Sequence, residues 1–229
     1  AVLAGQLTIG WSNDLIDLVR DRAAGRRDKP LARGDVSPGV VRTALVVTAV
    51  ATVVLSVACG LAAGVIHLVL VVGSGWAYNL GLKRTGASFI PYAVGFGALP
   101  HVVTLTSDET PSVQAWVTVA AALLGVGVHL FNALPDLADD AATGVEGLPH
   151  RLGEARLRLA ATLALLAATA VCLLGAALPG AAAAAGALVA IALAVVLWRG
   201  RGRVPFVGAI GVAALDVVVL VIGARSASG

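Results

Sequence analysis

The sequence predicts an all-α protein, a polytopic transmembrane bundle of about eight helices, and three observations support this prediction. Of the 229 residues, 59% are hydrophobic and only 13% are charged, with a mean hydropathy of +0.93. In a soluble domain roughly a quarter of the residues are charged, so much of the surface of this protein must face lipid. The apolar residues gather in runs long enough to span a bilayer, and one polar motif occurs twice in the chain.

Seven apolar runs predict membrane-spanning helices. They cover residues 43–59, 64–82, 88–106, 112–134, 156–178, 182–198 and 204–223. An eighth run, residues 1–12, is short and has neither a cap nor a basic flank. We therefore expect it to be the cytoplasmic end of a helix whose beginning is missing. A single transmembrane domain, residues 1–229, accounts for all of these runs.

Lysine and arginine are distributed unevenly along the chain. All but one of the 16 lie in four segments, 13–42, 83–87, 135–158 and 199–203. By the positive-inside rule these segments face the cytoplasm. We expect a multi-pass protein of the plasma membrane, with cytoplasmic cap loops at about 22–42 and 141–155. The net charge of +3 follows from this bias, so nucleic acid is not an expected partner.

Two nine-residue stretches, 13–21 and 132–140, share the pattern N-x-L-x-D-L-x-x-D. Helix positions i, i+4 and i+8 stay within about 80° of one another, so Asn13, Asp17 and Asp21 line one face. The offset between the stretches corresponds to four helices, which predicts two parallel repeats with both motifs on the same side of the membrane. Carboxylates gathered on one face repel one another unless a cation lies between them. The duplication therefore predicts a paired site for a divalent metal.

Two acidic clusters bordered by arginine and lysine suit a multiply charged anion held through Mg²⁺. This ion binds through one or two carboxylates and keeps its other positions for water and phosphate oxygens. The basic side chains then neutralise the outer phosphate oxygens. A diphosphate ester held in this way becomes a better leaving group. The apolar bundle suits a polyisoprenoid tail and excludes water that would quench an allylic carbocation.

The two motifs resemble those of the UbiA superfamily of intramembrane prenyltransferases. Supporting matches are Asp28-Lys29-Pro30-Leu31, Tyr78 with Leu82-Lys83-Arg84, and Leu148-Pro149-x-Arg151-Leu152-Gly153. The resemblance covers nearly the whole chain and implies nine helices, so the first would be missing and the second partial. It implies an enzyme, a Mg²⁺-dependent prenyltransferase. The substrates would be a polyprenyl diphosphate and a lipophilic acceptor, an aromatic or quinone precursor.

The resemblance also implies roles for individual residues. The metal ligands would be Asn13, Asp17 and Asp21 for one Mg²⁺ and Asp136 and Asp140 for the other, and the four aspartates would be catalytic. The expected diphosphate contacts are Lys29, Lys83, Arg84 and Arg151, and the expected pocket residues are Asp14, Asn79, His129 and Asn132. A structural role suits His129 equally well.

Several other polar residues receive simpler interpretations. Arg20 is interpreted as a topology charge. Tyr78 has two interpretations, contact with the prenyl group or acceptor and the commoner role of an aromatic at the membrane interface. Asp216 lies within the last apolar run and has no visible partner, so its role stays open.

Two other functions are compatible with the same pattern. An intramembrane terpene cyclase would ionise the same diphosphate and close the cation internally, without an acceptor. A secondary transporter is a more distant alternative, because parallel repeats also occur there, although its sites usually lie near the bilayer midplane. No feature of the sequence indicates one oligomeric state.

Overall fold

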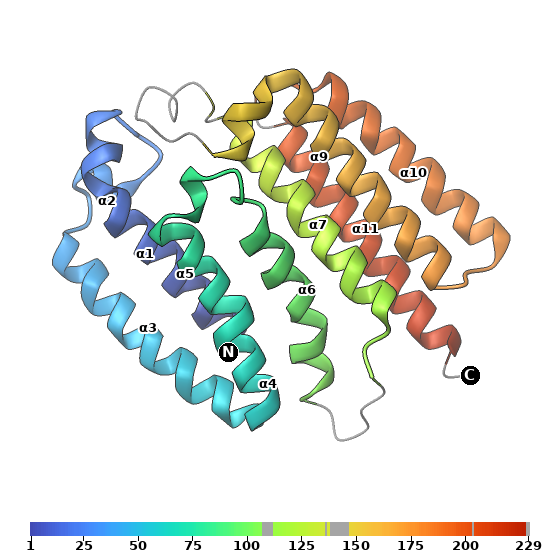
Figure 1. Cartoon of the computed structure of the whole chain (residues 1–229), viewed down its shortest axis with the longest axis horizontal. Coiled ribbons are helices and arrows are strands. Elements are labelled where there is room, and N and C mark those ends of the chain that lie inside the picture. The colour runs from blue at the N-terminus through green and yellow to red at the C-terminus, as the bar shows by residue number, and fades with distance from the viewer. Residues whose placement is uncertain (107–111, 136, 138–146, 203, 228–229) are drawn as a thin grey trace.

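The computed structural model describes residues 1–106, 112–135, 137, 147–202 and 204–227, and this part of the chain consists of helices and connecting loops (Figure 1). The first half contains α1 (Val2–Ala23), α2 (Pro30–Arg33), α3 (Pro38–Ala58), α4 (Leu61–Ile66), the π-helical segment η1 (His67–Val72), α5 (Gly73–Leu80), the 3₁₀ turn η2 (Leu82–Arg84) and α6 (Ile90–Thr104). The second half contains α7 (Ala115–Ala133), α9 (Leu148–Gly175), α10 (Gly180–Arg199) and α11 (Val204–Ala227).

The predicted all-α bundle is confirmed. Within the described residues, six segments are long and apolar enough to cross a membrane: α3, the continuous run α4–η1–α5, α7, α9, α10 and α11. The predicted run 88–106 forms the shorter apolar helix α6. The run at 1–12 is also helical, but α1 continues through the first motif to Ala23. Every predicted apolar run is therefore a helix.

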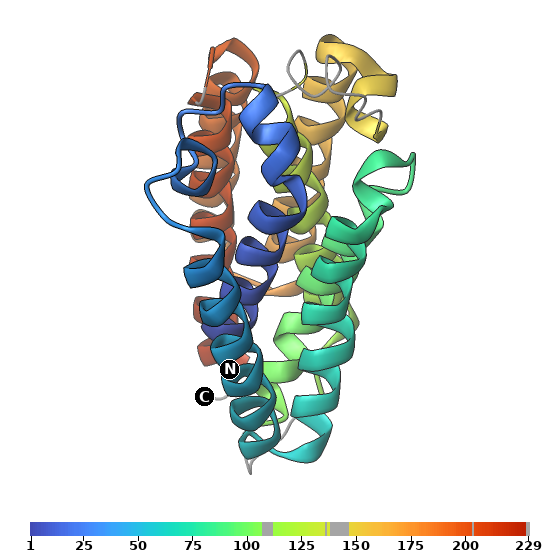
Figure 2. The ribbon, with the colours of Figure 1, turned by 90° about the vertical axis from the view of Figure 1, so that its left-hand side faces the viewer.

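The long helices alternate in direction along the chain, so the C-terminal ends of α1 and α7 lie at the same end of the bundle, the upper end in Figures 1 and 2. This arrangement confirms the prediction of two parallel repeats. The predicted cap loop 22–42 lies at that upper end and includes α2. Of the predicted cap loop 141–155, residues 147–155 belong to the described part of the chain, and there they begin α9.

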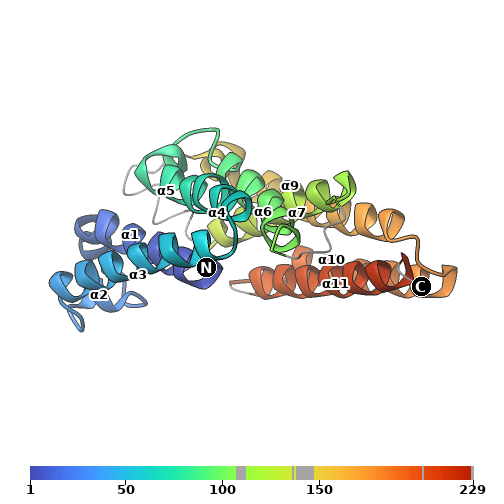
Figure 3. The same ribbon diagram turned by 90° about the horizontal axis from the view of Figure 1, so that it is seen from below.

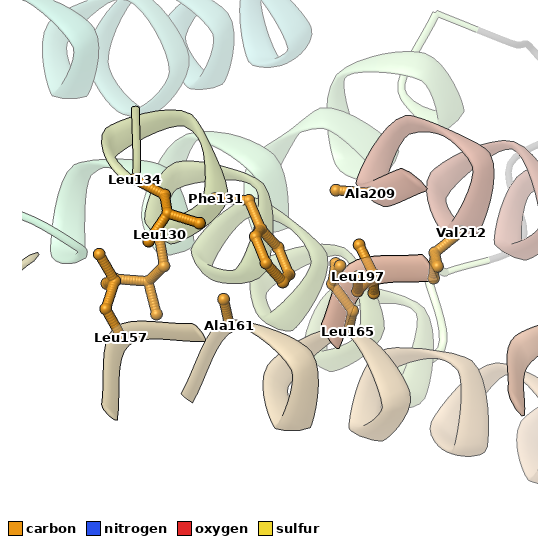
Figure 4. Close-up of a cluster of buried hydrophobic side chains, with 9 residues drawn as sticks. All are labelled: Leu130, Phe131, Leu134, Leu157, Ala161, Leu165, Leu197, Ala209 and Val212. Atoms are coloured by element: carbon orange, nitrogen blue, oxygen red, sulfur yellow. The ribbon is translucent and has the colours of Figure 1, made fainter. Parts of the chain in front are cut away.

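A hydrophobic core fixes α7 against the other helices of the second half. Phe131 is 1% exposed and packs with Leu165 of α9, Leu197 of α10 and Val212 of α11 (Figure 4). Gly127 allows this close packing, because a Cβ atom there would lie 2.6 Å from the Leu165 side chain. Viewed from below in Figure 3, α10 and α11 lie together on one side of the bundle and α1 and α3 on the other. The core therefore fixes the C-terminal end of α7, where the second motif begins.

In the first half, α1 and α5 approach closely and are joined by polar contacts. Gly75 of α5 faces Ile9 of α1 with no room for a Cβ atom. The Asn79 amide donates to the Ile9 carbonyl at 2.8 Å and to the Ser12 hydroxyl at 2.9 Å. Small residues and interhelical hydrogen bonds are the usual means of joining helices in lipid. These contacts set the position of η2, which follows α5, relative to the first motif.

Candidate functional site

A cavity of about 730 Å³ opens between the two halves of the bundle. Its wall is formed mainly by α1, α5, α6 and α7. At the loop end the wall carries polar groups, among them Asn13, Asp17, Lys29, Lys83 and Asn132. Further down it is apolar and aromatic, with Ile9, Val71, Tyr78, Tyr92, Phe96, Leu99 and His129. The cavity thus has a charged mouth and an apolar interior.

A buried ion pair between Asp17 of α1 and Lys83 of η2 lies at this mouth. The Lys83 ammonium of η2 is 2.6 Å from both carboxylate oxygens of Asp17 and donates to the Asn13 side-chain oxygen at 3.2 Å. Asp17 is 2% exposed and Lys83 7% exposed. Burial lowers the pKa of Lys83 even though Asp17 favours the charged ammonium. Arg20 also donates to Asp17, at 3.1 Å, so two cations neutralise this carboxylate.

A second ion cluster lies next to the first and involves the loop after α1. Lys29 donates to Asp21 at 2.8 Å and lies 3.1 Å from Asp14. Burial of Lys29 favours the neutral amine, but its hydrogen bonds to the two carboxylates outweigh that effect and raise its pKa. Arg26 donates two hydrogen bonds of 2.9 Å to Asp28, which lower the pKa of Asp28 to about 2. The loop therefore folds back so that Lys29 lies against the acidic face of α1.

The three residues of the first motif do not share one environment. Asn13 and Asp17 line the cavity, whereas Asp21 is buried against Lys29 and borders a separate small hollow beside the loop. The cause is geometric, because each step of four residues rotates a helical position by about 40°, and two steps carry Asp21 past the cavity edge. Asp14 likewise contacts Lys29 and does not line the cavity.

The oxygen atoms at the mouth suit a hard cation. Both carboxylate oxygens of Asp17 and the amide oxygen of Asn13 converge on one positive charge, the Lys83 ammonium. Mg²⁺ prefers oxygen ligands and uses one or two protein carboxylates together with substrate phosphates, so this pair fits such an ion. Within the described part of the chain no three acidic, histidine or cysteine side chains gather closely enough to hold a metal alone. Asp136 and Asp140 lie outside the described residues.

Below the charged mouth, aromatic rings form part of the cavity wall. Tyr92 of α6 stacks on His129 of α7, with ring centroids 4.3 Å apart and an interplanar angle of 23°. Tyr78 of α5 meets both rings edge-on, at 5.2 Å from Tyr92 and 5.6 Å from His129. Ser88 lies 3.3 Å from His129 Nε2. Three helices thus contribute rings to one surface.

The remaining predicted residues fall into two groups. Three of the predicted pocket residues line the cavity: Asn79, His129 and Asn132. Two of the predicted diphosphate contacts, Arg84 and Arg151, are exposed and do not line it. The Arg151 guanidinium lies beside Gly86, in the loop that follows η2.

The interpretation of Arg20 needs correction, the structure favours one of the two alternatives for Tyr78, and two wall residues were missed. Arg20 contacts both Asp17 and Asp21 and lines the cavity, so it is more than a topology charge. Tyr78 faces the cavity and its rings, because α5 turns this face toward α6. Tyr92 and Phe96 were not selected at all, although their i, i+4 spacing on an apolar helix places both rings on one face.

The fold and site define a polytopic membrane protein with a cavity that is charged at its mouth and apolar inside. The model of the UbiA prenyltransferase family matches residues 1–206, and the chain belongs to this family. It is therefore an intramembrane prenyltransferase, as the sequence motifs predict.

A solved structure shares this fold. The apo structure of a UbiA homolog from Aeropyrum pernix K1 superposes with a TM-score of 0.74 at 20% sequence identity. The match covers 96% of this chain and 85% of that one. No curated protein matches the chain.

Proposed function

We propose that this prenyltransferase moves a polyprenyl group from an allylic polyprenyl diphosphate to an aromatic or quinone-precursor acceptor, with Mg²⁺ as its metal. The observation that carries the proposal is the position of the Asn13–Asp17–Lys83 cluster at the head of an aromatic and apolar cavity. The charged end suits the diphosphate and the apolar end suits the isoprenoid tail. One cavity thus accommodates both ends of the donor.

In this proposal some residues at the mouth bind the metal and others bind the diphosphate. In the proposal Asn13 and Asp17 hold one Mg²⁺, and Asp136 and Asp140 hold a second, as the repeated motif suggests. When bound, Mg²⁺ neutralises charge on the departing diphosphate. Lys83 donates to the diphosphate oxygens in place of its contacts with Asp17.

Other charged residues support these contacts from the rim. Lys29 lines the same mouth and binds the diphosphate, while Asp14 and Asp21 hold its ammonium in place. Arg84 and Arg151 are exposed beside the mouth and neutralise the outer oxygens in this proposal. Arg20 balances the charge of Asp17 while Lys83 is engaged elsewhere.

The walls of the cavity favour transfer over hydrolysis. Asn79, His129 and Asn132 line the space in which an acceptor would meet the allylic carbon. Around them the wall is mostly apolar, and exclusion of water protects a reactive carbocation.

The proposed experiment measures diphosphate release and prenyl transfer by the purified protein in lipid nanodiscs, against Mg²⁺ concentration. Asp17→Asn and Asp136→Asn should each lower turnover by about 10²–10³-fold, because each removes charge that stabilises the leaving group. The double variant should lose much less than the product of the single losses, since both motifs hold one diphosphate. Full activity in excess EDTA, or near-normal turnover in either variant, would refute the metal-dependent mechanism.

Product analysis with and without an aromatic acceptor separates transfer from cyclisation. The proposal expects a prenylated acceptor by mass spectrometry and little hydrocarbon. A cyclic hydrocarbon formed at the same rate without any acceptor would favour the terpene cyclase.

We also propose that the mouth faces the cytoplasm from the plasma membrane, on the basis of the Lys and Arg distribution. Single cysteines at Ala24 and Thr143, in a background without Cys59 and Cys172, should react with an impermeant thiol reagent from the cytoplasmic side. A cysteine at Ser107 should react only from the other side. Reaction of positions 24 and 143 from opposite sides would contradict this topology.

A further inference from the structure

Tyr92 lies at the centre of the aromatic surface in the cavity. Its ring stacks on His129 at 4.3 Å, meets Tyr78 edge-on at 5.2 Å and stacks more distantly on Phe96 at 6.5 Å. All four side chains line the same cavity. Their shared surface therefore forms part of the wall of this cavity.

This surface begins directly below the charged mouth. Tyr78 lies close to the C-terminal end of α5, and η2 with Lys83 follows this end after Gly81. Both side chains line the cavity. A diphosphate that contacts Lys83 therefore holds its ester carbon at the level where the rings begin.

The rings are held in place by contacts outside the cavity. The Ser88 hydroxyl, completely buried, contacts His129 Nε2 at 3.3 Å. Gly125 of α7 lies against the Tyr92 carbonyl and the Phe96 side chain, and a Cβ atom there would be 2.6 Å from that carbonyl. Since α6 and α7 cannot separate without breaking this packing, Tyr92 keeps a fixed orientation toward the cavity.

Ionisation of an allylic diphosphate places a positive charge where the described structure offers no free anion. The bond between C1 and the ester oxygen breaks, its electron pair leaves with the diphosphate, and the charge spreads over the allylic carbons. With the donor bound as proposed, Asp17 would be neutralised by Mg²⁺ and by Arg20. An aromatic face attracts such a cation through its quadrupole, and unlike a carboxylate it does not react with the cation.

We propose that Tyr92, fixed by its stack on His129, is a catalytic residue whose ring stabilises the allylic carbocation. This inference rests on the proposed function, because it requires an ionising allylic donor. Tyr78 and Phe96 widen the same surface toward the mouth and the interior, while His129 orients the Tyr92 ring.

The first test separates ionisation from binding. Diphosphate release without acceptor is measured for wild type, Tyr92→Phe and Tyr92→Leu, together with binding of a thiolodiphosphate analogue that resists ionisation. Tyr92→Leu should lower kcat for release about 30-fold, and Tyr92→Phe by less than about 3-fold. Analogue binding should stay within about 2-fold in both. Trp198→Leu, which removes a lipid-facing ring that is 51% exposed, is the matched control and should keep full activity.

A second measurement excludes a purely structural role of Tyr92. Phenylalanine, monofluoro-, difluoro- and trifluorophenylalanine are placed at position 92, since successive fluorines withdraw charge from the ring face with little change in shape. Log kcat should fall steadily along this series. A flat series, or Tyr92→Leu with unchanged kcat, would overturn the inference even if Tyr92→Leu folds poorly. Wild-type protein that releases no diphosphate would instead refute the proposed function.

Discussion

Breaking the buried pair Asp17–Lys83 should strongly destabilise the metal-free protein, and Lys83→Met tests this. Removing one partner of a buried ion pair costs about 3–5 kcal/mol, because the other charge stays buried without compensation. Arg20 remains 3.1 Å from Asp17, so we expect the lower end, about 3 kcal/mol. For a chain of this length each kcal/mol changes Tm by about 2–4 °C. Lys83→Met should therefore lower Tm by about 6–12 °C.

The double variant Asp17→Asn/Lys83→Met distinguishes an ion pair from simple loss of packing. It buries no uncompensated charge at this position, so it should recover most of the lost stability. Thermal unfolding is followed after metal removal through reaction of a thiol dye with Cys172, which is 2% exposed, in a Cys59→Ala background. Arg33→Met, which breaks an exposed ion pair, is the control and should change stability by less than about 1 kcal/mol. If the double variant lost the sum of the single effects, the pair would not be coupled and the reasoning would be wrong.

Two further predictions concern backbone contact and buried charge. Gly147→Ala should raise KM for the diphosphate about tenfold with less effect on Tm, because a Cβ atom there would collide with the Lys83 carbonyl. Gly39→Ala, where the nearest neighbour of the new Cβ atom would be 3.8 Å away, is the matched control. Equal KM values for the two variants would contradict the role of Gly147 in positioning Lys83. Asp216→Leu should stabilise the protein by about 1–3 kcal/mol in the same thermal assay, because Asp216 is 4% exposed and neither of its oxygens has a hydrogen-bond partner among the described residues. A lower Tm would show that its carboxyl is stabilising.

The helices could be predicted from the sequence because length and apolar composition decide whether a segment crosses lipid. The same holds for the parallel repeats, since an even number of spans between two motifs returns them to one side. Which residues of a helix face the cavity was harder to predict. Asn13 and Asp17 share the cavity face, but Asp21 has turned away and is paired with Lys29, which returns from a loop whose path the sequence does not specify.

Charge and aromatic patterns were less informative about the site itself. Arg20 was interpreted as a topology charge because cations of the mouth and cations of the positive-inside rule occupy the same segments. Tyr92 and His129 come from different helices, and only the packing of α6 on α7 brings their rings together. Residue type and spacing within one helix contain no signal for such a pair.

The π-helical segment η1 determines which residues of α5 reach the mouth of the cavity. A π turn accommodates one residue more than an α turn, so everything after it is rotated by about 100° relative to an uninterrupted α-helix. Asn79 and Lys83 follow this segment, and both depend on that rotation to meet α1. Deletion of one residue from 67–72 would leave the hydrophobic length nearly unchanged and turn neighbouring side chains toward Asp17 instead. The angular setting of the lysine is thus encoded more than ten residues before it, in a segment that is aliphatic except for the buried His67.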